Sequence, residues 1–157
     1  MNDTLIVYFS YTGNTKKVVE RIHALKGYDI EEIIPVEAYA KNYQEVVDAE
    51  EAKIGEEDTI DIQPLSVSLE KYKRIIIGTP VWWYTCAPAI RTFLLENHLS
   101  GKEIIPIVTH GGWLGHTIED IQKYAKEATM RTYLDLEFAD ASMRKTQKEL
   151  DNWIATL

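Results

Sequence analysis

The polar run from Ser10 to Thr15 has the composition of a phosphate-binding loop. It reads Ser-Tyr-Thr-Gly-Asn-Thr, comes directly after the apolar stretch 5–9 and leads into a segment with helical periodicity. The N-terminus of a helix presents backbone N–H groups without intrahelical acceptors and the positive end of the helix dipole, and both attract anions. We therefore expect hydroxyls and backbone N–H groups, rather than lysines, to bind a phosphate here.

Two further loops carry residues suited to a flat ligand. The segment 78–84 reads Gly-Thr-Pro-Val-Trp-Trp-Tyr, and the segment 109–115 reads Thr-His-Gly-Gly-Trp-Leu-Gly. Successive side chains of an extended loop point in different directions, so at least one of Trp82, Trp83 and Tyr84 should face a crevice or solvent. A planar ligand would cover that ring, and stacking of this kind contributes about 1–3 kcal/mol in nucleic-acid sites. The alternative is that the rings only anchor the loop against neighbouring helices.

Five apolar stretches predict the strands that must position these loops. The stretches 5–9, 75–77 and 104–108 are almost continuously apolar, as in central strands of a parallel sheet covered on both faces. Pro106 is unfavourable within the third stretch because proline removes a ladder donor. The remaining stretches, 30–34 and 133–138, mix apolar with charged residues, which suits edge strands.

Segments with helical spacing alternate with these strands. Val18 and Ile22 mark the apolar face of the first helix, and Gly27 is placed to end it. The second helix has the weakest pattern, with Tyr43 and Val46 as its main apolar residues, and the segment 55–64 is expected to be loop.

Alternating strands and helices predict one α/β domain over residues 1–157. Right-handed crossovers, with the second and fifth strands at the edges, favour a five-stranded parallel sheet of order 2-1-3-4-5 with helices on both faces, a three-layer sandwich. In such a sheet ligands bind at the carboxyl ends of the first and third strands, where the chain direction diverges. All three loops described above would line that crevice.

Composition excludes several partners and indicates a compartment. The formal charge of −8 and the pI near 5.0 argue against binding to nucleic acid or an anionic membrane. Cys86 is the single cysteine, so no internal disulfide can form and a reducing compartment is expected. The sequence begins without the basic and apolar segments of a secretory signal, and no apolar run approaches the ~20 residues of a membrane span. We therefore expect a cytoplasmic protein.

Other combinations of reactive residues fit known chemistry less well. Cys86 and Arg91 stand one residue closer than the cysteine-arginine loop of tyrosine phosphatases requires. His110, His116 and Asp120 lack a spacing that would hold a metal ion, so no metal site is expected. The glycines of 111–115 do not form the fingerprint of a dinucleotide-binding loop. A receiver domain is disfavoured because it needs aspartates where this chain has polar uncharged residues.

The three loops together resemble those of the flavodoxins, FMN-binding proteins that are themselves an example of the crevice rule. The resemblance runs from Leu5 to about Ile121. It implies that the first loop binds the FMN phosphate, with Gly13 permitting close approach, and that the other two loops sandwich the isoalloxazine ring. Either Trp82 or Trp83 would stack on the ring, and the sequence leaves this choice open. The residues expected at the cofactor are Ser10, Thr12, Gly13, Asn14, Thr15, Thr79, Pro80, Val81, Trp82, Trp83, Tyr84, Thr109, His110, Gly111, Gly112, Trp113 and Gly115.

The resemblance implies electron transfer, with a redox partner protein or a small flat acceptor. Electron-carrier flavodoxins usually have a glycine beside the flavin N5 atom, whereas residues 81–87 contain none. The alternative is an FMN-dependent NAD(P)H reductase of quinones or similar flat acceptors, in which Tyr84 and Trp113 would wall a substrate slot. His110 is the catalytic candidate, because an imidazole near the ring could donate a proton. Carrier and reductase, and the oligomeric state, stay open.

Overall fold

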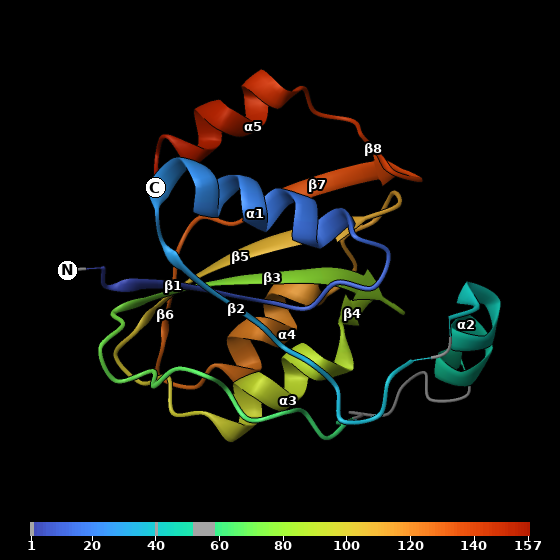
Figure 1. Cartoon of the computed structure of the whole chain (residues 1–157), viewed down its shortest axis with the longest axis horizontal. Coiled ribbons are helices and arrows are strands. Elements are labelled where there is room, and N and C mark those ends of the chain that lie inside the picture. Colours follow the sequence, from blue (N-terminus) through green and yellow to red (C-terminus); the bar gives the residue numbers. More distant parts are fainter. Residues whose placement is uncertain (1, 40, 52–58) are drawn as a thin grey trace.

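A mostly parallel β-sheet forms the centre of the molecule (Figure 1). The computed structural model describes residues 2–39, 41–51 and 59–157. The strands are β1 (Thr4–Tyr8), β2 (Asp29–Glu32), β3 (Arg74–Trp82), β4 (Thr85–Cys86), β5 (Glu103–His110), β6 (Thr129–Met130), β7 (Leu134–Ala139) and β8 (Ser142–Met143). They lie in the order β2-β1-β3-β5-β7-β8, and the first five of this path are parallel. These five have the predicted order 2-1-3-4-5, so the predicted fold class is confirmed.

Three short strands were not predicted. β4 pairs antiparallel with β3, β8 pairs antiparallel with β7, and β6 pairs with the beginning of β5. Two-residue turns at 83–84 and 140–141 return the chain onto the strand it has just left. Neither turn contains glycine, so neither was visible as a turn in the sequence. As a result β7, predicted to be an edge strand, has β8 beside its carboxyl end.

The sheet accommodates Pro106 at an interruption of its ladder. On one side β5 pairs with β3 throughout, and Pro106 lies opposite Ile77. On the other side β6 pairs with Glu103 and Ile104, whereas β7 pairs only from Ile107 onward. On this side Pro106 therefore falls between the two partner strands, at a position where neither of them forms a ladder pair.

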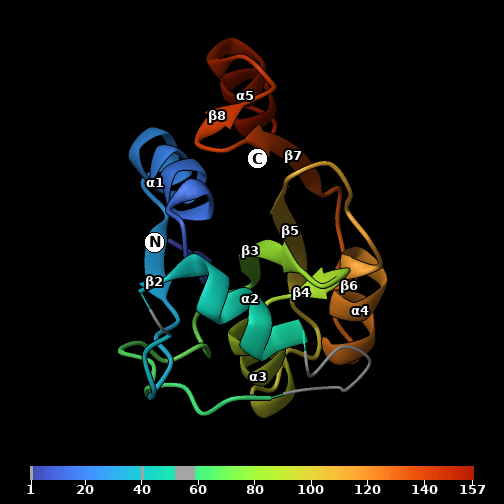
Figure 2. The same cartoon turned by 90° about the vertical axis from the view of Figure 1, so that its right-hand side faces the viewer.

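Helices cover both faces of the sheet (Figure 1). The helices are α1 (Asn14–Lys26), α2 (Tyr43–Glu51), α3 (Pro88–Glu96), α4 (Thr117–Tyr124) and α5 (Gln147–Ile154). α1 and α5 lie on one face and α3 and α4 on the other, while α2 lies beyond the carboxyl ends of the strands (Figures 1 and 2). Alternate residues of β1 belong to the two cores, because Ile6 lies in the same buried cluster as Val18 and Ile22, and Leu5 lies in the cluster that contains Phe93.

The ends of α1 and the region around α2 agree with the sequence pattern. Gly27 ends α1 with a φ of 70°, as predicted. α2 begins at Tyr43 and Val46 is buried. Within the predicted loop 55–64, residues 55–58 lie outside the described residues, and residues 59–64 form no helix and one isolated bridge, from Ile62 to Pro35.

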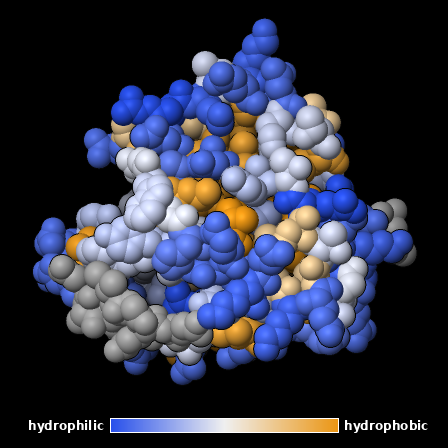
Figure 3. Space-filling view, turned by 180° about the vertical axis from the view of Figure 1, so that it is seen from behind, coloured by the Kyte–Doolittle hydropathy of each residue, from blue (hydrophilic) through white to orange (hydrophobic). Residues whose placement is uncertain are grey.

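The outer surface is mostly hydrophilic on the face shown in Figure 3, with smaller hydrophobic areas between the polar residues. Among the helices of the described residues, none combines the length and the apolar character needed to cross a lipid bilayer.

Candidate functional site

A cavity of about 460 Å³ opens at the carboxyl ends of the parallel strands. We call it the strand-end cavity. Its walls come from the loop after β1, from the carboxyl ends of β3, β5 and β7 with the residues that follow β5 and β7, and from the start of α2: Tyr11, Thr12, Asn14, Thr15, Tyr43, Pro80, Val81, Trp82, Thr109, His110, Gly111, Phe138, Asp140 and Ala141. This is the crevice that the strand order predicts. Among the described residues that line it there is no lysine or arginine.

The N-terminus of α1 supplies backbone donors to this cavity. Gly13 stands at the N-cap with a φ of 100°, a conformation that favours glycine, and no side chain caps the helix from this position. The Ser10 hydroxyl accepts the N–H of Lys16 at 3.2 Å. In the described part of the chain the N–H groups of Asn14 and Thr15 have no protein acceptor. These two donors are therefore available to an anion.

A buried hydrogen bond joins the first loop to the third. The hydroxyls of Thr15 and Thr109 lie 2.8 Å apart, and both side chains are buried. Gly78 allows the start of α1 to lie this close to the sheet, because a Cβ at this position would be 2.8 Å from the Val19 side chain and 3.2 Å from the Thr15 methyl group. The Thr15 hydroxyl, expected at the phosphate, is thus already bonded within the protein.

The turn after β7 closes the cavity beside the helix N-terminus. The Asn14 side-chain amide donates to the carbonyl of Asp140 at 2.8 Å. Asp140 has a φ of 53°, and it lines the cavity together with Ala141 and Phe138. Nothing in the sequence had indicated a role for this turn.

Only one of the two adjacent tryptophans lines the strand-end cavity. Trp82 lines the strand-end cavity and makes edge contacts with Phe9, Tyr11 and Tyr39 at centroid distances of 5.5, 5.9 and 5.0 Å. Trp83 does not line that cavity but a neighbouring one beneath α2. Of the two candidates for ring stacking, Trp82 is therefore the one positioned at the strand-end cavity.

Tyr84 and Trp113 form an exposed aromatic pair outside the cavity. Their ring centroids are 5.1 Å apart, and 45% and 64% of these residues are exposed. Gly115 packs against the backbone of Tyr84 so closely that a Cβ at position 115 would lie 2.3 Å from the Tyr84 carbonyl oxygen. The N–H of His116 donates to the same oxygen at 2.7 Å. These contacts connect the second loop to the third.

Both ring nitrogens of His110 have protein partners. Nδ1 accepts the N–H of Gly112 at 3.0 Å, so the proton of the neutral ring is on Nε2, which donates to the carboxylate of Asp135. The His110 side chain is only 8% exposed. A proton-donor role for His110 stays a prediction, and it would require one of these bonds to break.

The predicted site residues divide into two groups. The structure brings Thr12, Asn14, Thr15, Pro80, Val81, Trp82, Thr109, His110 and Gly111 together in the strand-end cavity. Outside its lining are Ser10, Gly13, Thr79, Trp83, Tyr84, Gly112, Trp113 and Gly115. Thr79 is fully buried, where its hydroxyl donates to the Pro80 carbonyl at 2.8 Å and accepts the Ala87 N–H at 3.1 Å. Tyr11 lies in a loop expected at the crevice but had been given no role at the cofactor, and the lining residues that the sequence did not indicate are Tyr43, Phe138, Asp140 and Ala141.

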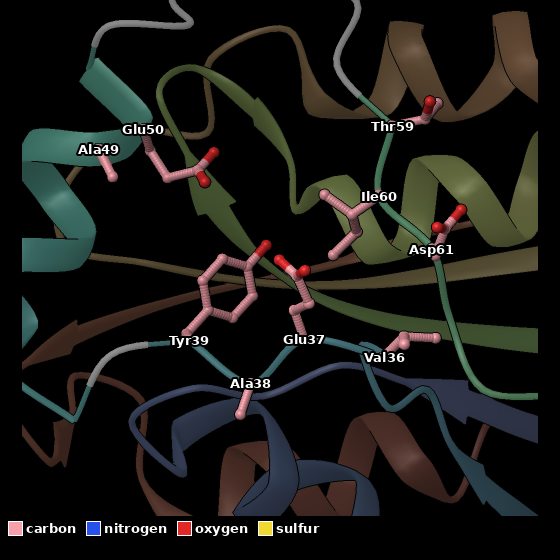
Figure 4. A pocket seen from close by; sticks show the side chains of 9 residues that line it. All are labelled: Val36, Glu37, Ala38, Tyr39, Ala49, Glu50, Thr59, Ile60 and Asp61. Carbon is pink, nitrogen blue, oxygen red and sulfur yellow. The ribbon is translucent and has the colours of Figure 1, made fainter.

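A separate cavity of about 510 Å³ is slightly larger but chemically different (Figure 4). Residues 36–39, two residues of α2 and residues 59–61 line it. Its described lining includes the carboxylates of Glu37, Glu50 and Asp61 and no lysine or arginine, and Glu37 and Glu50 point into it in Figure 4. These carboxylates would repel a phosphate. We therefore assign the candidate site to the strand-end cavity despite its smaller volume.

Cys86 is not a nucleophile in this fold. Burial raises the pKa of its thiol to about 11, although the charge of Arg91 acts in the opposite direction. At neutral pH the thiol is therefore protonated, and it is the thiolate that reacts.

The fold and the position of the strand-end cavity are those of the doubly wound α/β proteins. In that class, ligands bind where the strand order reverses. A family model described as flavodoxin matches residues 3–157, so this chain belongs to the flavodoxin family. No match was found among curated proteins.

Solved structures agree with this assignment. A flavoprotein from Lactobacillus acidophilus NCFM, solved in complex with FMN, is 25% identical with a TM-score of 0.76, and the match covers 98% of this chain and 99% of that one. A candidate flavoprotein from Bacteroides eggerthii DSM 20697 has 23% identity and a TM-score of 0.81, over 99% and 98% of the two chains. Two-electron reduced Megasphaera elsdenii flavodoxin has 19% identity and a TM-score of 0.56, over 98% and 99%. The last two comparisons support the fold alone.

Proposed function

We propose that this protein binds FMN in the strand-end cavity and acts in electron transfer. The observation that carries the proposal is the combination, in one cavity, of two unpaired backbone donors at the start of α1 and the indole of Trp82. A phosphate and a planar ring are the two parts of FMN that such a cavity would hold. Membership of the flavodoxin family and the FMN complex of the 25% identical Lactobacillus acidophilus protein support it.

The residues available to each part of FMN follow from the walls of the cavity. The N–H groups of Asn14 and Thr15 and the exposed hydroxyl of Thr12 would bind the phosphate. Trp82 on the β3 side and His110 and Gly111 on the β5 side would hold the ring. Bound FMN supplies reversible uptake and release of electrons. The protein groups bind and orient the cofactor and exclude water from one side of it.

Electron transfer to a partner protein is consistent with the charge of the chain. The formal charge of −8 would attract a basic partner and speed its association at low ionic strength. We propose a redox protein of that kind as the partner.

A second candidate is an FMN-dependent NAD(P)H reductase of quinones or similar flat acceptors. The exposed ring pair of Tyr84 and Trp113 favours it, because both rings come from loops that flank the strand-end cavity. A flat acceptor could contact these rings while the cofactor occupies the cavity.

Two successive experiments test FMN binding and then the choice between electron carrier and reductase. Titration of the purified protein with FMN should quench flavin fluorescence and shift the visible spectrum, and the absence of any change at micromolar FMN would refute the proposal. With FMN bound, a stable semiquinone on anaerobic titration without direct reduction by NADH or NADPH supports the carrier. Rapid reduction by either nucleotide, followed by turnover with a quinone, supports the reductase.

The indoles provide an internal control for the assignment of the ring site. Trp82→Ala should relieve the quenching of bound flavin and weaken FMN binding, because only the first of the two adjacent tryptophans lines the strand-end cavity. Trp83→Ala should leave both nearly unchanged. The reverse order of effects would place the flavin beside the other indole.

A further inference from the structure

We propose that a second cavity, beneath α2, is a binding site for a neutral molecule with a single aromatic ring. The cavity has a volume of about 210 Å³. Tyr43, Val46, Val47 and Glu50 of α2 form one side, and the end of β3 (Val81 and Trp82) with the first turn residue, Trp83, forms the other. We call it the α2 slot. α2 lies in front of the carboxyl ends of the strands in Figure 2, so the slot is at the same end of the molecule as the strand-end cavity.

The volume of the α2 slot limits the size of its ligand. An apolar protein cavity of about 150 Å³ is large enough to hold benzene. Sites for drug-sized molecules and cofactors have about 300–1,000 Å³. At about 210 Å³ the slot fits one six-membered ring with small substituents. A nucleotide or a fused multi-ring molecule would extend beyond this volume.

The walls of the α2 slot favour an uncharged aromatic ligand. They consist of two indoles, a phenol ring and three valines, together with one carboxylate, that of Glu50. Within the described residues that line the slot there is no lysine, arginine or histidine to pair with an anion. Aromatic walls gain from the offset or edge-on packing of another ring, in addition to the area that becomes buried. The ligand class is therefore a neutral aromatic ring, such as a phenol.

A turn in a rare conformation presents Trp83 to the slot. Trp83 and Tyr84 form the two-residue turn between β3 and β4 and have φ angles of 50° and 73°. L-residues seldom adopt this conformation, and such strain gathers at functional sites. Gly115 and the His116 N–H hold the carbonyl side of the turn in place. Trp83 is thus fixed as a wall of the slot instead of packing into the core.

The α2 slot is adjacent to the strand-end cavity but does not depend on its occupant. Tyr43, Val81 and Trp82 line both cavities, so a ring in the slot would lie behind the same indole that faces the proposed cofactor site. All the walls are protein side chains. The proposal therefore goes beyond FMN binding and can fail or succeed independently of it.

The test is a titration with phenol, monitored by NMR of the indole N–H signals in ¹⁵N-labelled protein. Benzoate serves as the probe with the same ring and a negative charge. We expect phenol to shift the Trp83 signal in a saturable manner, both without FMN and with FMN present, and benzoate to shift it far less. An unchanged Trp83 signal, or equal effects of the two probes, would overturn the proposal.

Two valine variants locate the bound phenol. Val47→Phe fills the α2 slot and should weaken phenol binding by at least about tenfold, because the new ring takes the space that the ligand would occupy. Val36→Phe adds the same bulk at a residue that is 53% exposed and lines the separate cavity of about 510 Å³ and not the α2 slot, so this variant should bind phenol normally. Loss of binding in Val36→Phe instead would assign phenol to the other cavity. If Val47→Phe does not fold, Val47→Met replaces it and should likewise weaken phenol binding.

Discussion

The close contact between Gly115 and Tyr84 makes Gly115→Ala a sharp test of the site architecture. A Cβ at position 115 would lie 2.3 Å from the Tyr84 carbonyl oxygen and 2.7 Å from its carbonyl carbon, and the φ of Gly115 is 62°. The substitution therefore has two costs, one from the backbone conformation and one from the steric overlap. Gly101 has a φ of 78° and open space around its Cβ position, so Gly101→Ala carries only the first cost.

The expected magnitudes separate these two costs. An L-residue in the left-handed region costs about 1–2 kcal/mol, and loss of glycine freedom in the unfolded chain returns about 0.4–1 kcal/mol. Gly101→Ala should therefore destabilise the protein by about 1 kcal/mol. Overpacking against backbone adds about 1–3 kcal/mol, which gives about 2–4 kcal/mol for Gly115→Ala.

Urea denaturation, followed by far-UV circular dichroism, measures the free energy of unfolding of both variants. In thermal denaturation, at about 2–4 °C per kcal/mol for a domain of this size, Gly115→Ala should lower the Tm by roughly 4–16 °C. Gly115→Ala should also shift the NMR signals of Tyr84 and Trp113, which Gly101→Ala should leave in place. Equal losses of stability in the two variants would show that the third loop does not pack on the Tyr84 turn.

Three other substitutions test separate parts of the site. Thr12→Val should weaken FMN binding by about tenfold to a hundredfold with little change in stability, because Thr12 is exposed and a bond to a charged group contributes about 1.5–3 kcal/mol; unchanged affinity in a fluorescence titration would remove it from the site. Thr15→Val should cost about 1–3 kcal/mol of stability by leaving the buried Thr109 hydroxyl without its partner, and the double variant with Thr109→Val should recover part of this loss in urea denaturation. The pKa of Cys86 is about 11 in the folded state against an ordinary value of 9.0, so its neutral form stabilises the fold below about pH 9 and this contribution is lost as the pH rises toward 11. Cys86→Ala should flatten the fall in stability over that range, and identical pH profiles would contradict the assignment.

The layout of the sheet was predictable because burial leaves a pattern in the sequence. Apolar runs at 5–9, 75–77 and 104–108 became the three central strands. The β3–β4 and β7–β8 hairpins were not predictable, since residues such as Tyr84 and Asp140 adopt positive φ only because tertiary contacts hold them there. Local sequence preferences record no such contacts.

The candidate site was predictable to the same extent. The rule that ligands bind at strand ends located the loops of Thr12, Trp82 and His110 correctly at one cavity. It did not reveal that Thr15 and Thr109 would bond to each other, or that α2 would bring Tyr43 to the cavity from a distant part of the chain. Hydrogen-bond partners and long-range packing depend on distances that spacing along a sequence does not contain.

The bonds between the loops determine how this protein should meet a ligand. Thr15 is hydrogen-bonded to Thr109, Asn14 to Asp140 and His116 to Tyr84, and none of these hydrogen bonds needs a bound molecule. The entropy of ordering the loops is thus spent during folding and not during association. Binding should consequently be fast, with a backbone that hardly moves between the free and occupied states.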